Sequence, residues 1–369
     1  MFVEKKEVAS IIKKIESIVK FKKTWQFIDS VMLVSNCMRY HSCERIELFF
    51  GTHFEITDSI KSEMNRIANV YFVDFELFEK YFRKEELVWN EHFTIRKSSS
   101  SYFQLSATEY SCYGYSIFVY DQINTIVAMK GNNIIAFISD KSEFAIIELF
   151  RDLVVKDQEN KGALFLHAAA VVKNDKAYII CGKGGAGKST TLLEMIFKYN
   201  FKFLSGDKVV FKIIDGKVFV HGWPDYPNLG VGTLQKYETL KRIVPSCITD
   251  LKSKDKILID FATFYSIKGL KPYKGFFSIT CFLFPDINLT KNTTEIIKLP
   301  DITEVFYKNL EFREDYDYRK WQRIIEINYD RQESIVKISK CIENIIGYEI
   351  IGQLTMSEKG LFHEGFIEN

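Results

Sequence analysis

The sequence has 369 residues, of which 47% are hydrophobic and 15% aromatic, so it is long enough for two globular domains with substantial cores. Its formal net charge of +2 creates no global field that would favour nucleic acid or a membrane as a partner. No apolar run is long enough for a membrane span, and the seven cysteines show neither zinc-site nor disulfide-framework spacing, so we expect a cytoplasmic protein.

The first region, residues 1–158, is predicted to form a separate α+β domain that contributes to substrate recognition. Apolar residues from Val8 to Val19 recur at helical spacing and are surrounded by lysines. Packing against its own domain is the simpler interpretation of this helix, and binding to a membrane surface or an acidic partner is the alternative. The aromatic-rich stretch from Tyr71 to Trp89 is also predicted to be helical.

Sequence typical of β-strands follows from Ser101 to Ser139, and Gly131-Asn132 predicts the turn of a hairpin within it. A helix is predicted from Ser142 to Lys156. The polar residues from Asp157 to Gly162 then indicate a break, and we place the domain boundary there. The second domain is predicted over residues 159–352, with a C-terminal tail over 353–369.

The second domain opens with two apolar strands, Leu164 to Val172 and Lys176 to Cys181, separated by a turn at Asn174-Asp175. A connection this short permits a hairpin but no crossover, so the two strands are predicted to be antiparallel. Three more short strands follow near residues 203–205, 209–214 and 217–221. The sequence therefore predicts an α/β domain whose sheet is mixed and partly antiparallel.

The segment after the second strand fits the phosphate-loop pattern G-x-x-x-x-G-K-[ST] and leads into a predicted helix from Thr190 to Tyr199. Backbone N–H groups of such a loop, at the positive end of the helix, cradle a polyphosphate. Lys188 is expected to reach the β and γ phosphates, and the Ser189 hydroxyl to coordinate Mg²⁺. The predicted nucleotide-binding residues are Gly182, Lys183, Gly184, Gly185, Ala186, Gly187, Lys188, Ser189 and Thr190.

Two residues outside the loop are candidates for catalysis. Asp207 follows a short apolar strand, where it could bind the metal or take a proton from an acceptor hydroxyl, and a surface turn carboxylate is the alternative. His167 lies within a run of alanines and reads equally as a catalytic or a core histidine. Asp260 is a further acidic metal candidate, and Arg313 or Arg319 could neutralise phosphate charge, although a helix surface with ion pairs is favoured for the last two.

The segments 166–171 and 203–210, together with the phosphate loop, resemble the HPr kinase/phosphorylase-like kinases. With Gly222-Trp223-Pro224 and residues 229–234, the chain looks closest to members from peptide natural-product (lasso-peptide-type) pathways. The resemblance is good over residues 162–240, is weak over the rest of the second half, and does not extend to the first domain. It implies a fold related to phosphoenolpyruvate carboxykinase, places Asp207 on the second acid of the family's Asp-Asp pair, and matches His167 to a histidine near the active site. Gly206 stands where the family has its first acid.

The resemblance implies a magnesium-dependent kinase that transfers the γ-phosphoryl group of ATP, or alternatively GTP, to a hydroxyl. We expect a serine of a peptide or protein as the acceptor, with a small-molecule alcohol as the alternative. A nucleotide-gated ATPase that modifies no acceptor is a third hypothesis. No nucleic-acid-binding motif is present. Relatives of this family form oligomers, so a homo-oligomer is compatible with the resemblance.

Overall fold

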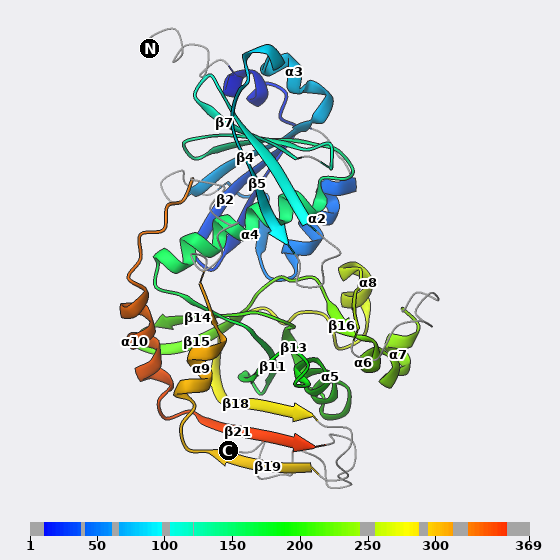
Figure 1. The fold of residues 1–369 in the computed structure, drawn as a ribbon, viewed down its shortest axis with the longest axis vertical. Helices are drawn as coiled ribbons and strands as arrows, with labels where there is room; N and C mark the ends of the chain where they lie inside the picture. The colour runs from blue at the N-terminus through cyan, green and yellow to red at the C-terminus, as the bar shows by residue number, and fades with distance from the viewer. Residues whose placement is uncertain are drawn as a thin grey trace. The chain divides into compact units, whose positions relative to one another are not determined.

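The computed structural model describes residues 11–37, 41–60, 66–97, 104–120, 122–243, 255–287, 294–312 and 324–352. The chain divides into two compact units (Figure 1). Unit 1 consists of Met1–Lys161 and Phe312–Tyr329, and unit 2 of Gly162–Glu311 and Asp330–Asn369. Both units combine helices with mixed sheets, as the predicted α+β class requires. No helix in the described part of the chain combines the length and apolar composition that a membrane span needs.

Unit 1 is built on a nine-stranded sheet in which β2, β4 and β9 run parallel and the other neighbouring strands pair antiparallel. In spatial order its strands are β3 (Glu55–Thr57), β1 (Phe21–Phe27), β2 (Ser30–Asn36), β4 (Arg66–Asp74), β9 (Asn133–Ile138), β8 (Ile126–Lys130), β7 (Tyr115–Tyr120), β6 (Gln104–Cys112) and β5 (Val88–Lys97). The hairpin predicted at Gly131-Asn132 is confirmed, because β8 and β9 pair with Lys130 opposite Asn133.

Helices cover this sheet. Residues 11–16 are helical, and Ile11 and Ile15 are buried beside Tyr71 and Val73 of β4, so the first helix packs on its own domain as predicted. Phe150 of α4 packs edge-on against Trp25 of β1. Within the described residues, the other helical elements of unit 1 are α2 (His41–Gly51), η2 (Phe75–Leu77), α3 (Phe78–Tyr81), η3 (Lys84–Glu86) and α4 (Glu143–Asn160).

The helix predicted from Tyr71 to Trp89 is wrong. This stretch contains the end of β4, three short helical pieces and the start of β5. β4 lies between two parallel neighbours, and four consecutive residues from Val70 to Val73 are buried. A strand buried on both faces lacks the alternation of polar and apolar residues, so its sequence cannot be distinguished from that of a buried helix.

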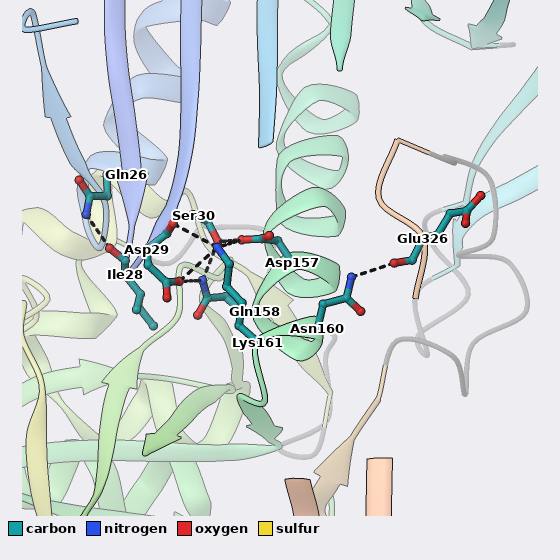
Figure 2. A network of polar contacts seen from close by, with 9 residues as sticks. All are labelled: Gln26, Ile28, Asp29, Ser30, Asp157, Gln158, Asn160, Lys161 and Glu326. Atoms are coloured by element: carbon teal, nitrogen blue, oxygen red, sulfur yellow. Dashed lines mark hydrogen bonds and ion pairs between the residues drawn. The ribbon is translucent and has the colours of Figure 1, made fainter. Parts of the chain in front are cut away.

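The polar break predicted from Asp157 to Gly162 is also wrong in its first part, because α4 continues to Asn160. Its polar side chains form tertiary contacts (Figure 2). Ser30 donates to Asp157 at 2.5 Å, and Gln158 donates to Asp29 at 2.6 Å. Asn160 donates to the carbonyl of Glu326 at 2.8 Å, which ties the returning segment 324–329 to unit 1.

Unit 2 has a ten-stranded mixed sheet (Figure 1), in which the phosphate-loop strand β12 lies between β11 and β18. The main path is β13 (Lys202–Ser205), β11 (Ala168–Lys173), β12 (Lys176–Cys181), β18 (Phe277–Ile287), β15 (Lys217–Gly222), β14 (Val209–Ile214), β10 (Leu164–Leu166) and β20 (Leu310–Glu311). Off this path, β21 (Ile346–Gly352) pairs with β18 and with β19 (Thr294–Leu299). The predicted antiparallel pairing of the first two strands is confirmed for β11 and β12, whereas β12 and β18 run parallel.

The helix after the loop, α5 (Lys188–Tyr199), buries Leu192, Leu193 and Ile196 against β11 and β12. A separate two-stranded sheet joins β16 (Asn228–Gly230) to β17 (Lys256–Leu258). The remaining helices are α6 (Val231–Lys236), α7 (Glu238–Lys241), α8 (Phe261–Ser266), α9 (Thr303–Asn309) and α10 (Arg331–Ile342). The phosphate loop therefore begins at the end of the buried strand β12.

Candidate functional site

The loop from Gly182 to Gly187 connects β12 to the N-terminus of α5, as its motif predicts. Every residue of β12 after Lys176 is buried, which fixes the start of the loop in the sheet. The first N–H groups of α5 have no partner within their helix and carry the positive end of its dipole. The loop is therefore oriented for an anionic group at the end of the sheet.

The loop backbone has a shape that side chains would disturb. Gly182 and Gly187 have φ angles of +146° and +104°. A Cβ atom on Gly187 would lie 2.2 Å from Cγ1 of Ile287, at the end of β18. The backbone N–H of Ile287 also donates to the carbonyl of Ala186 at 2.9 Å. The parallel neighbour β18 therefore fixes the far side of the loop.

Lys188 folds back over the loop and donates from Nζ to the carbonyl of Gly182 at 2.6 Å. Burial lowers the pKa of Lys188, and Lys256 adds to this effect, while Asp207 opposes both electrostatically. A partly desolvated ammonium has lost favourable interactions with water. An anionic ligand placed in the loop would compensate for that loss.

The two hydroxyl residues after Lys188 have different surroundings. Ser189 is half-buried in the first turn of α5. The Thr190 hydroxyl lies 3.1 Å from that of Thr233 in α6, so its side chain ties α5 to α6. Of the loop residues themselves, Lys183, Gly184 and Gly185 are exposed and Ala186 is half-buried.

Asp207 lies in the tight connection between β13 and β14. The Ser205 hydroxyl fixes this connection, donating to the carbonyl of Lys208 at 2.5 Å and accepting from the backbone N–H of Trp223 at 3.4 Å. The side chain of Asp207 is 49% exposed, and its Oδ1 lies 3.7 Å from Nε2 of His167. Asp207 thus faces other site residues and does not behave as an isolated turn carboxylate.

Gly206, beside Asp207, has room for a side chain. Its φ lies outside the left-handed region, and an added Cβ would meet Phe203 at an ordinary 3.7 Å. No steric reason in the described residues therefore explains glycine at this position.

His167 lies where the chain passes from β10 to β11. Its backbone N–H donates to the carbonyl of Asn309 at 2.8 Å. The side chain is 36% exposed, so the core-histidine interpretation is wrong. On the side opposite Asp207, Nδ1 lies 3.2 Å from Oε1 of Glu311.

Two residues of this cluster, Lys208 and Glu311, are absent from the sequence predictions. Nζ of Lys208 lies 2.5 Å from Oε2 of Glu311. Although burial alone would raise the pKa of Glu311, Lys208 and His167 hold it well below its usual range. Lys208 directly follows Asp207, which is a local signal. Glu311 is 144 residues from His167 and reaches it only because β20 pairs with β10.

The structure thus brings Asp207 and His167 together, and it places the phosphate loop with Lys188 at the same edge of the sheet, because β11 pairs with both Cys181 and Ser205 near one of its ends. Asp260 has a different role, because its carboxylate caps α8 by accepting from the backbone N–H and the hydroxyl of Thr263. Arg313 and Arg319 lie outside the described residues.

Ser189 at the start of α5 and Asp207 in the β13–β14 connection carry oxygen ligands of the chemical kind that magnesium takes. Mg²⁺ retains several waters and is typically held by one or two protein oxygens together with substrate phosphates. The Ser189 hydroxyl and the Asp207 carboxylate are oxygen donors of this type. Within the described ranges, no group of three or more His, Cys, Asp or Glu side chains could hold a metal by itself.

Comparisons with known proteins add no assignment. No protein-family model matches the chain, and no curated protein matches it at a significant level. The interpretation of the site therefore depends on its own geometry.

Proposed function

We propose that unit 2 is a magnesium-dependent kinase that transfers the γ-phosphoryl group of ATP to a hydroxyl, and that the acceptor is a serine of a peptide or protein. The observation that carries this proposal is that β11 pairs Ala168 with Cys181 and Ala170 with Ser205, so the phosphate loop after Cys181 and the connection that holds Asp207 after Ser205 leave the sheet at the same edge. A donor-binding cation and a candidate proton acceptor therefore belong to one site. The HPr kinase-like fold and the choice of ATP over GTP belong to the same proposal.

The residues divide the reaction between them. The loop backbone and Lys188 bind the β and γ phosphates, and Ser189 and Asp207 would supply oxygens to the metal ion. A bound Mg²⁺ would contribute neutralisation of the charge that develops during transfer. Asp207 accepts the proton of the acceptor hydroxyl as its oxygen attacks the γ phosphorus. The bond from that phosphorus to the nucleotide breaks, and its electron pair leaves with the nucleoside diphosphate.

Label transfer tests the proposal directly. The purified full chain is incubated with Mg²⁺, γ-labelled ATP or GTP, and either a peptide pool or a metabolite pool from the cell that makes it. We expect label in a peptide serine. Label in a metabolite would identify a small-molecule kinase, and label only in free phosphate would identify an ATPase and refute the kinase proposal.

Three variants assign the roles within this assay. Asp207→Asn should keep nucleotide binding and lose transfer by roughly 10²-fold or more. Lys188→Ala should lose nucleotide affinity. Asp215→Asn makes the same chemical change as Asp207→Asn in the exposed β14–β15 turn and should behave as wild type. Full transfer by Asp207→Asn would remove Asp207 from the mechanism.

A further inference from the structure

The carboxylate of Glu311 contacts a different side chain with each of its oxygens. Oε1 lies 3.2 Å from Nδ1 of His167, and Oε2 lies 2.5 Å from Nζ of Lys208. The Glu311 and Lys208 side chains are only 20% and 11% exposed. Lys208 thus holds one oxygen of Glu311, and the other oxygen faces one nitrogen of the His167 imidazole.

This contact determines which nitrogen of His167 carries the proton. An ionised carboxylate can only accept hydrogen bonds, so Nδ1 beside Glu311 must be an N–H donor. In the neutral ring, the other nitrogen is then an acceptor. That nitrogen, Nε2, lies 3.7 Å from Asp207, which is beyond hydrogen-bond distance, so the shorter contact with Glu311 decides the tautomer. The backbone of His167 is fixed independently by its hydrogen bond to Asn309.

We propose that Glu311 is a positioning residue that holds His167 as the Nδ1–H tautomer with Nε2 directed at Asp207. This inference rests on the proposed function for its kinetic consequence. The proton that leaves the acceptor hydroxyl for Asp207 would pass to Nε2 of His167 once their 3.7 Å separation shortens to hydrogen-bond distance in the complex with substrate, which frees the Asp207 carboxylate. The imidazolium formed is paired with Glu311, and no further reactant is required.

A purely structural role for Glu311 makes a different prediction. If Glu311 served only to attach β20 and Lys208, its replacement would lower stability without altering the tautomer of His167. Glu311→Gln separates the two roles because it keeps the size of the side chain. The ammonium of Lys208 can only donate hydrogen bonds, so it pairs with the amide oxygen of the new glutamine side chain. The NH₂ group of that glutamine then faces Nδ1 of His167. Nδ1 must then accept, and the ring changes to the Nε2–H tautomer.

Nuclear magnetic resonance of the full chain labelled with ¹⁵N-histidine measures this directly at a pH where the ring is neutral. His167→Asn assigns the His167 signals. We expect the Nδ1–H tautomer in wild type and in Glu304→Gln, a matched change on exposed α9, and the Nε2–H tautomer in Glu311→Gln. An Nε2–H wild type, or a tautomer unchanged in Glu311→Gln, would overturn the proposal. Glu311→Ala provides a second variant, in which the preference for Nδ1–H should be lost.

The kinetic test uses the acceptor identified by label transfer. Glu311→Gln should lower kcat by roughly 10²- to 10⁴-fold, as expected when a catalytic imidazole is held in the wrong tautomer, while nucleotide affinity stays unchanged. The double variant with His167→Asn should lose no more kcat than His167→Asn alone, because both changes disable the same His167–Glu311 pair. Fully additive losses would refute the positioning role. Because the tautomer is measured without substrate, an inactive wild type would refute the kinase proposal and leave the Glu311 test intact.

Discussion

Gly187→Ala tests whether the loop has the backbone shape that phosphate binding requires. Gly187 combines a φ of +104° with a Cβ position that lies 2.2 Å from Cγ1 and 2.7 Å from Cβ of Ile287. Gly184, in the same loop, is the matched control. It has no positive φ, and no atom lies within 4 Å of the position that a Cβ would take there.

The cost of the substitution has two parts. The left-handed conformation costs an alanine about 1–2 kcal/mol. Forcing a methyl group into the space of Ile287 adds about 1–3 kcal/mol as strain or backbone movement. The sum, about 2–5 kcal/mol, is a large part of a typical folding free energy of about 5–15 kcal/mol. Gly184→Ala should change stability by no more than about 0.5 kcal/mol.

Urea denaturation measures the stability of both variants, and titration with a fluorescent ATP analogue measures their affinity. We expect Gly187→Ala to be less stable and to bind nucleotide poorly, and Gly184→Ala to remain close to wild type in stability. Adding Ile287→Ala to Gly187→Ala removes Cγ1 but keeps Cβ, so it should restore only part of the nucleotide affinity. Equal stability and affinity of the two single variants would refute the loop geometry.

Two further predictions concern the acidic side of the site. The pKa of Glu311 is lowered in the folded chain, so its ionised form stabilises the fold above the unfolded-state pKa of about 4.3 and this contribution is lost as the pH falls. Glu311→Gln should therefore be less stable than wild type by about 1–3 kcal/mol at pH 7. Urea denaturation should show that this difference in the free energy of unfolding becomes smaller below about pH 4. A difference that does not depend on pH would contradict the ionised, paired state of Glu311 in the folded chain. Gly206→Asp should melt within a few degrees of wild type, because an added Cβ makes only an ordinary contact with Phe203. A loss of stability above about 2 kcal/mol would show that the position has no room for a side chain.

Local sequence signals predicted the parts of unit 2 that depend on neighbouring residues. The phosphate-loop pattern located the turn between β12 and α5, and the short link at Asn174-Asp175 required β11 and β12 to be antiparallel. Both residues of that link adopt positive φ, as a tight hairpin turn requires. Such features are encoded within a few residues of chain, so the sequence alone is sufficient for them.

Features that depend on distant pairing were not predicted. No sequence pattern points to Glu311 itself, and its role appears only when β20 pairs with β10 and places it beside His167. The polar end of α4 was misread for a related reason. Asp157 and Gln158 resemble a solvated linker in sequence, but their partners are Ser30 and Asp29, which lie well over 100 residues earlier in the chain.

The charges around the loop explain why Lys208 and Lys188 serve different purposes. Lys208 is neutralised at 2.5 Å by Glu311, so its positive charge is used within the protein. The ammonium of Lys188 contacts a neutral carbonyl, and burial destabilises it more than Asp207 stabilises it, so its pKa is lowered. An incoming polyphosphate would relieve this destabilisation, so binding energy should concentrate at Lys188. Glu311 binds Lys208 with one oxygen and leaves its second oxygen for His167.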